Sequence, residues 1–218
     1  RTVRGANGKV LGYNAQAAAD ADTGLVLAAE VFQTSADRGL LGPMAEKLAS
    51  QHGELLAGAE IVADKGYDSH EGLQVCADLG FEASVPPQDG SALFWSAASE
   101  TEIVCPMGQT PEKVQEVMSH GKLCGVWRVR TCSRCPLVQF CTEGRRKRGR
   151  SLVVPLGCNP VLRVLQAHRA RTPEGKEAMS ERMGCIEQFF GWIKWVLKAD
   201  RFLRRGLAGA RLEIGILA

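Results

Sequence analysis

The nine residues Ile61-Val62-Ala63-Asp64-Lys65-Gly66-Tyr67-Asp68-Ser69 join an apolar, β-favouring start to an acid and a turn. The start is typical of a buried strand, and Gly66 permits a tight turn after it. Either of the last two residues can cap a helix that begins at His70. Asp64 is therefore predicted to lie at the carboxyl end of a core strand, where open α/β sheets bind ligands. The alternative is that Asp64 is only a polar loop residue after a strand.

The segments around this stretch predict an α/β arrangement, in which an antiparallel hairpin is followed by strands joined by helices. Apolar residues alternate in the hairpin and repeat every three to four residues in the helices. The predicted elements are, in order, a hairpin over 9–33 with its turn at 20–24, a helix that ends at Gly53, a strand over 59–63, a helix over 70–79 and a strand over 81–85.

The last part of the chain is predicted to be helical, with one helix from residue 173 to about residue 198. Glu187 borders its apolar stripe, and Lys194 lies seven residues further on, on the same face. The alternative for both residues is a solvated side chain of the kind that most helices carry. The stripe consists of Met183, Ile186, Phe190, Ile193 and Leu197.

The composition is ordinary for a globular protein of one domain with an insertion. The chain has 218 residues, 45% hydrophobic and 23% charged, with a net charge of +3 from 27 basic and 24 acidic residues. No membrane span and no signal peptide are visible, which favours a cytoplasmic protein. The chain begins at Arg1 and stops within an apolar helical pattern, so a fragment of a longer protein is expected.

Eight cysteines are present, and most of them fall within residues 88–158, where no long helical or strand period runs. In a cytosolic protein such crowding indicates metal binding or redox chemistry before structural disulfides. Cys105, Cys132, Cys135 and Cys141 form the pattern C-x26-C-x2-C-x5-C, which predicts one tetrahedral zinc ion. Cys124 is an alternative to Cys105, and free or redox-active thiols are the alternative to zinc.

Basic residues cluster late in the chain and predict contacts with nucleic-acid phosphates. A second basic patch contains Arg201, Arg204, Arg205 and Arg211. The alternative is that the basic residues are only solvated surface side chains. Phosphate contacts position a duplex without specifying its sequence. The main run consists of Arg145, Arg146, Lys147, Arg148 and Arg150.

Three motifs together resemble the DDE transposases of bacterial insertion sequences. Cys105-Pro106 and Cys132-x-x-Cys135-Pro136 resemble the branch of that family whose DDE domain carries a cysteine-bearing insertion. The resemblance follows the family's order over nearly the whole chain. The three motifs are Asp64-Lys65-Gly66-Tyr67-Asp68-Ser69, Gly12-Tyr13-Asn14-Ala15-Gln16-Ala17 and Ile186-Glu187-Gln188-Phe189-Phe190-Gly191-Trp192-Ile193-Lys194.

The resemblance implies a ribonuclease-H-like α/β fold, a mixed sheet flanked by helices, in which an acidic triad binds two divalent cations, Mg²⁺ or Mn²⁺. Asp64 matches the second aspartate, and Glu187 and Lys194 match the glutamate and lysine of the signature Tyr-x2-Arg-x3-Glu-x6-Lys. The implied organisation is a catalytic core over 1–87, with its first strand missing, a cysteine-rich basic insertion over 88–158 and a helical second part of the core over 159–218.

The chain departs from the family pattern at three places. The signature tyrosine is replaced by Ser180, and its arginine position holds Met183, with Arg182 one residue early. The first aspartate is expected on a strand upstream of Arg1, so this chain alone is expected to be a poor catalyst. Three other aspartates match a turn and a loop instead: Asp20, Asp22 and Asp37.

The implied function is cleavage and joining of DNA strands by a nucleoid-associated bacterial transposase, acting as a homodimer on double-stranded transposon ends and target DNA. Phosphodiester chemistry of this kind suits two hard cations held by carboxylates on a strand end and a packed helix. One alternative is a non-catalytic zinc-knuckle DNA-binding protein derived from a transposase. Another is a nuclease of similar fold that only hydrolyses.

Overall fold

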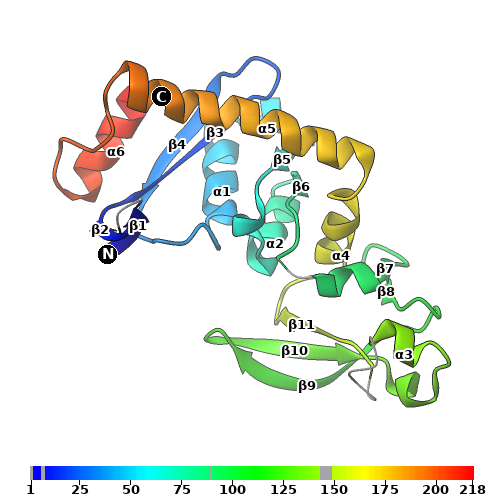
Figure 1. Ribbon diagram of the computed structural model, residues 1–218. Helices are drawn as coiled ribbons and strands as arrows, with labels where there is room; N and C mark the ends of the chain where they lie inside the picture. The colour runs from blue at the N-terminus through cyan, green and yellow to red at the C-terminus, as the bar shows by residue number, and fades with distance from the viewer. Residues whose placement is uncertain (1, 6–7, 89, 143–148) are drawn as a thin grey trace.

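The computed structural model of the chain describes residues 2–5, 8–88, 90–142 and 149–218, and its architecture is mixed α/β. Figure 1 shows an upper part, crossed by the long helix α5 (Pro173–Gly191), and a lower lobe built on a three-stranded sheet. The predicted α/β class is therefore confirmed.

Two antiparallel hairpins begin the chain. β1 (Thr2–Gly5) pairs with β2 (Gly8–Leu11), and β3 (Asn14–Ala19) pairs with β4 (Val26–Phe32). The turn predicted at 20–24 is confirmed, and Gly24 closes it with a φ of 73°. The hairpin predicted over 9–33 was placed too early, because residues 8–11 pair back on β1 and do not extend β3.

The first hydrophobic core is built by two helices and a parallel strand pair. α1 (Leu41–His52) is followed by β5 (Glu60–Val62), and α2 (His70–Asp78) connects β5 to the parallel strand β6 (Glu82–Ser84). Of the two predicted candidates, Ser69 caps α2, because its hydroxyl accepts a hydrogen bond from the Gly72 amide. The buried residues include Leu41, Met44, Leu48, Leu73, Cys76, Phe81 and Val85.

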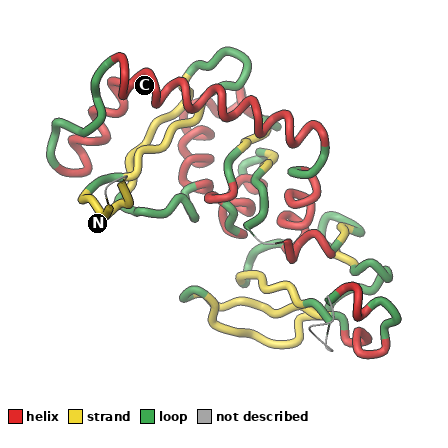
Figure 2. The backbone as a smooth tube through the Cα atoms, in the orientation of Figure 1, coloured by secondary structure: helices red, strands yellow, loops and turns green. Residues whose placement is uncertain are grey.

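Within the described residues, β3–β4 and β5–β6 are two separate two-stranded sheets. Figure 2 shows these strand pairs apart from each other and from the sheet of the lower lobe. Helix α5 contacts β3 and β5, and α1 contacts β3 and β4. Helix α5 therefore packs on both strand pairs and α1 on the β3–β4 pair, although no strand in the described part of the chain joins the pairs.

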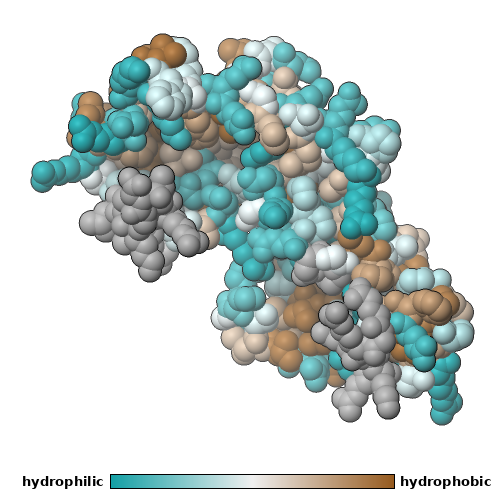
Figure 3. Space-filling view, viewed as in Figure 1, coloured by the Kyte–Doolittle hydropathy of each residue, from teal (hydrophilic) through white to brown (hydrophobic). Residues whose placement is uncertain are grey.

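The lower lobe has a core of its own, which the sequence did not indicate. It contains β7 (Ser96–Ala97), β8 (Ile103–Val104), β9 (Glu112–Ser119), β10 (Lys122–Arg128), α3 (Val138–Cys141) and β11 (Ser151–Pro155). β9 shows no apolar alternation because most of its residues are exposed. Apolar residues gather on the surface of this lobe (Figure 3). Its core consists of Trp95, Ile103, Val129, Leu152 and Val154 with Val161 and Val164 of the next helix.

The C-terminal part is helical as predicted. α4 (Pro160–Arg169) and α5 begin after the side-chain caps Asn159 and Thr172, each followed by proline. A π-helical turn, Trp192–Val196, continues α5, and α6 (Gly206–Leu217) follows. The predicted apolar stripe is only partly buried. Ile193 is 4% exposed but Met183 is 52% exposed, because α5 packs on narrow two-stranded sheets.

None of the helices in the described parts of the chain is both long enough and apolar enough to cross a membrane.

Candidate active site

Asp64 lies just beyond the carboxyl end of β5, where the strand gives way to a 3-10 turn at Lys65–Tyr67. Its Oδ1 accepts a hydrogen bond of 2.7 Å from the Gly66 amide, so the side chain caps this turn. Nearly half of the side chain stays exposed. Local backbone geometry thus fixes the carboxylate while its outer face remains accessible.

The group of α5 that reaches Asp64 is the guanidinium of Arg182. Its Nη2 lies 3.3 Å from Asp64 Oδ2, and the two side chains form an ion pair. Met183, which occupies the signature's arginine position, is 52% exposed and lies outside this contact. The arginine that lies one residue before the signature's arginine position is therefore the one that faces Asp64.

Glu187 and Lys194 are both exposed. Glu187 makes no hydrogen bond or ion pair with any residue that the structure describes. The face of α5 turned toward the sheets contains Ala178, Arg182 and Cys185, and Glu187 follows Cys185 by about 200° of helical rotation. The π-helical turn changes the spacing along the helix, so the seven-residue interval to Lys194 does not span two regular α-turns.

Polar residues next to Asp64 form a network that the sequence analysis missed. Asp37 Oδ1 accepts hydrogen bonds from Asn14 Nδ2 at 2.8 Å and from Gln16 Nε2 at 2.9 Å. The hydroxyl of Tyr67 donates to Gln16 Oε1. Burial first, and then the charges of Asp37 and Asp64, raise the pKa of Tyr67, so it stays a neutral donor.

The signals for this network were present in part. Asn14 and Gln16 are two residues apart on a strand, which predicts that they share a face. No spacing pattern indicated that the loop residue Asp37 would meet them, because the contact joins the loop after β4 to β3 and to the turn after β5.

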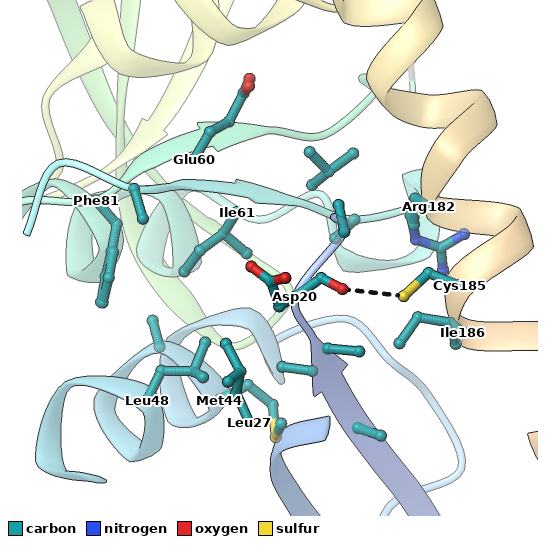
Figure 4. Close-up of a pocket in the computed structure, with 18 of the residues that line it drawn as sticks. Asp20, Leu27, Met44, Leu48, Glu60, Ile61, Phe81, Arg182, Cys185 and Ile186 are labelled. Carbon is teal, nitrogen blue, oxygen red and sulfur yellow. Dashed lines mark hydrogen bonds between the residues drawn. The ribbon is translucent and has the colours of Figure 1, made fainter. Parts of the chain in front are cut away.

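A cavity of about 360 Å³ lies between the two strand pairs, beneath α5. Figure 4 shows Ile61 from β5, Met44 and Leu48 from α1, and Ile186 from α5 around it, with Arg182 at its edge. The Cys185 thiol donates to the backbone oxygen of Asp20 at 3.3 Å, which ties α5 to the end of β3. Strand residues 16–19 and 60–62 both line the cavity, so the two sheet edges face it together.

The described residues do not by themselves form a metal centre. No three His, Cys, Asp or Glu side chains among them are grouped so that they could hold an ion. Both oxygens of Asp64 are already engaged, one by the Gly66 amide and one by Arg182. In this arrangement the site does not fit a divalent cation, and the guanidinium of Arg182 contacts the Asp64 carboxylate instead.

The four cysteines predicted to bind zinc lie near one another in the lower lobe. The pKa of Cys132 is raised first by burial and then by the charges of Cys105, Cys135 and Cys141. All of them are free thiols. A charge affects a neighbouring pKa over a longer distance than a bond between a metal ion and its ligand. These cysteines therefore lie in the same region, but among the described residues they are not grouped closely enough to hold a metal ion.

Most of the basic run lies outside the described residues, namely Arg145, Arg146, Lys147 and Arg148. Arg150 is described and half-buried. Its guanidinium carbon lies 3.2 Å from the ring centroid of Phe94, and its Nε donates to the backbone oxygen of Cys141. One face of this guanidinium is therefore covered by protein.

A family model described as "Transposase DDE domain" matches residues 104–218, which include the four cysteines of the predicted zinc site, Arg182 and Glu187. Searches of the curated proteins and of the solved structures found no match to this chain.

Proposed function

Because this chain belongs to the DDE transposase family, we propose that it forms a catalytic domain that cuts DNA strands and joins them during insertion-sequence transposition. Family membership indicates transposition-related DNA cleavage in general. The observation that carries the finer proposal is Asp64, a carboxylate fixed at a strand end and faced by α5, the helix that also bears Glu187.

The proposed reaction is in-line displacement at phosphorus. In cleavage, water adds to phosphorus, the P–O3′ bond breaks and the freed 3′-oxygen takes up a proton. In joining, the oxygen of that 3′-hydroxyl forms a new bond to a target phosphorus, the target's own P–O3′ bond breaks, and the displaced 3′-oxygen takes up the proton that the hydroxyl loses. Carboxylates and cations must be held rigidly around such a centre, which strand ends and packed helices achieve.

DDE transposases generally depend on divalent metal ions. We assign Mg²⁺ or Mn²⁺ to Asp64 and Glu187, which requires a further carboxylate and the departure of Arg182 from Asp64. The described residues do not provide this arrangement, and so the metal assignment rests on the family and on the position of Asp64.

The cavity between β3 and β5 supports the proposed ribonuclease-H-like sheet. An added strand there would pair with the facing edges of both strand pairs and join them into one mixed sheet between α1 and α5. An aspartate near the end of that strand would lie beside Asp64. The proposal thus keeps 1–87 and 159–218 as the core, with 88–158 as the cysteine-rich insertion.

We also propose that the cysteine set binds one zinc ion and that the lobe holds DNA. The nearness of Cys105, Cys135 and Cys141 to Cys132 supports the first point. Purified protein should contain about one equivalent of zinc, which Cys135→Ser removes and Cys185→Ser on α5 does not. Zinc content below about a tenth of an equivalent contradicts this assignment.

The proposed partners are double-stranded transposon ends and target DNA, bound by a homodimer. Lys194 and the run from Arg145 to Arg150 are proposed to contact phosphates, which matches the exposure of Lys194. The alternative function is a non-catalytic DNA-binding protein derived from a transposase. The ion pair between Arg182 and Asp64 favours that alternative, because it neutralises the acid.

The deciding experiment uses the complete reading frame that encodes this chain, with the DNA that flanks it and either Mg²⁺ or Mn²⁺. Asp64→Asn and Glu187→Gln should each abolish cleavage and joining while DNA binding stays near normal. Glu177→Gln is the matched control, because Glu177 is an exposed glutamate on the same helix. Wild-type cleavage by either acid variant contradicts the assignment, and DNA binding without any cleavage by the unaltered protein favours the alternative.

A further inference from the structure

A second pocket, of about 790 Å³, lies at the other end of α5, between the start of β3, the π-helical turn and α6. Figure 1 shows α6 and the chain leading to it beside the β3–β4 hairpin. The pocket is lined by four cationic residues, Lys194, Arg201, Arg204 and Arg205. The three arginines follow the π-helical turn, and the proposed reaction does not use them.

These four cations are exposed, and none of them forms an ion pair within the described parts of the chain. Two acids share the lining, so the four positive and two negative side chains leave an excess of two positive charges. One acid, Glu213, is occupied by the backbone, because it accepts hydrogen bonds of 3.0 Å from the amides of Leu203 and Arg204. The loop that carries the arginines is thereby held in place without neutralising their guanidinium groups.

The inner wall of the same pocket is apolar and aromatic. Ile193 and Ile214 are buried there, at 4% and 3% exposure. Tyr13 and Phe202 pack edge to face with ring centroids 6.3 Å apart, and both stay partly accessible. A flat ring that enters the pocket would thus meet aromatic surface, while any attached anion would meet the cations at the rim.

We propose that this pocket binds an unpaired nucleotide of a DNA strand, with its base against Tyr13 and Phe202 and the flanking phosphates on Arg201 and Arg204. Aromatic platforms inside a positively charged groove are how proteins hold single strands without sequence preference. The pocket has the size of a small-molecule site and cannot take a duplex, so the base must be out of its helix. The inference rests on the proposed action on DNA, and it adds a site separate from Asp64.

The test measures binding of a fluorescently labelled 12-nucleotide strand to the 218-residue chain without divalent metal. Three further ligands are the same strand with its central bases replaced by abasic residues, the same strand in a duplex, and an RNA strand of the same sequence. The pocket variant is Arg201→Ala/Arg204→Ala. The matched control is Lys47→Ala/Arg169→Ala, which removes the same charge from two side chains outside the lobe that are already paired with Glu30 and Glu82.

The pocket variant should bind the DNA strand at least about tenfold more weakly, and its slope of log affinity against log salt should flatten by roughly 1.4 for two lost contacts. The control variant should change neither quantity. Removing the bases should weaken binding by the unaltered chain about tenfold and should have no effect on the pocket variant.

Equal affinity for the normal and abasic strands would overturn the proposal, as would an equal loss in the control variant. Tighter binding of the duplex or of RNA would overturn the assignment to an unpaired DNA nucleotide. The binding measured here takes place without divalent metal, at residues other than Asp64. Failure here is therefore distinct from failure of the proposed cleavage, which depends on Asp64 and on divalent metal.

Discussion

At the residue scale, Arg182 forms an ion pair with the carboxylate oxygen of Asp64 that a bound metal ion would need as a ligand. The guanidinium lies 3.3 Å from Oδ2, and Asp64 keeps 46% of its side chain exposed. An ion pair this accessible contributes at most about 1 kcal/mol to folding, because water screens it. Its main consequence is electrostatic competition at the carboxylate.

We expect Arg182→Ala to bind Mn²⁺ several-fold more tightly than the unaltered chain. The substitution frees one carboxylate oxygen and removes a positive charge beside it. Titration calorimetry measures the affinity, and urea unfolding checks that stability changes by less than about 1 kcal/mol. Met183→Ala is the control on the same helix. An unchanged or weaker Mn²⁺ affinity in Arg182→Ala contradicts the competition, and adding Asp64→Asn should cancel the gain.

The placement of Asp64 could be predicted from the sequence, because an apolar strand, a glycine turn and a helix cap are all local signals. Its neighbours could not. Asp37 and Arg182 reach the site through contacts across 27 (64 − 37) and 118 (182 − 64) positions, and no short-range pattern encodes them.

At the scale of elements, α5 depends on one close approach at its first turn. A Cβ on Gly175 would come within 2.2 Å of the backbone oxygen of Arg169, at the end of α4. The glycine is buried, and the obstacle is backbone that cannot rotate away. Gly184, in the middle of the same helix, has open space around it.

Two alanine substitutions in α5 should therefore act in opposite directions. Gly175→Ala should destabilise the protein by about 1–3 kcal/mol or more, because α4 and α5 must move apart. Gly184→Ala should stabilise it by about 0.5–1 kcal/mol, because alanine restricts the unfolded chain and favours the helix. Urea unfolding of both variants measures the difference. A stable Gly175→Ala protein would show that the α4–α5 junction can open at little cost.

Helix caps and the main hairpin were predictable because capping side chains and turns are short-range features. The sheet of the lower lobe was not. Most residues of β9 are exposed, so the strand has no apolar alternation that could be recognised in the sequence. β1 was missed because residues 9–11 were predicted as the start of the next strand, whereas backbone pairing folds them onto β1.

At the scale of the whole molecule, a buried polar junction connects the segment before the lobe with the helix after it. Asp68 is 2% exposed, and its Oδ2 accepts from Arg163 Nη2 and from the Gln88 amide, both at 2.9 Å. Arg163 Nη1 also lies 3.2 Å from His70 Nε2. Because arginine only donates, Nε2 must accept, and His70 is held in its neutral form.

The same geometry makes stability depend on pH. Burial first, and then the charge of Arg163, lower the pKa of His70 to about 4, while Asp68 and Glu71 act in the opposite direction. The unfolded chain takes up this proton near pH 6.5, before the folded protein does. Stability from the neutral histidine is therefore complete above about pH 6.5 and declines as the pH falls toward 4.

We expect His70→Gln to remove this decline. The glutamine oxygen can still accept a hydrogen bond from Arg163, but it does not titrate. Between pH 7 and pH 4 the unaltered chain should therefore lose up to about 3 kcal/mol more unfolding free energy than the variant. Urea unfolding at each pH measures it, and His120→Gln, an exposed histidine in the β9–β10 turn, is the control. If the unfolding free energies of His70→Gln and the unaltered chain change in parallel with pH, then His70 takes up its proton equally well in the folded and unfolded states. The contact with Arg163 would then not lower its pKa.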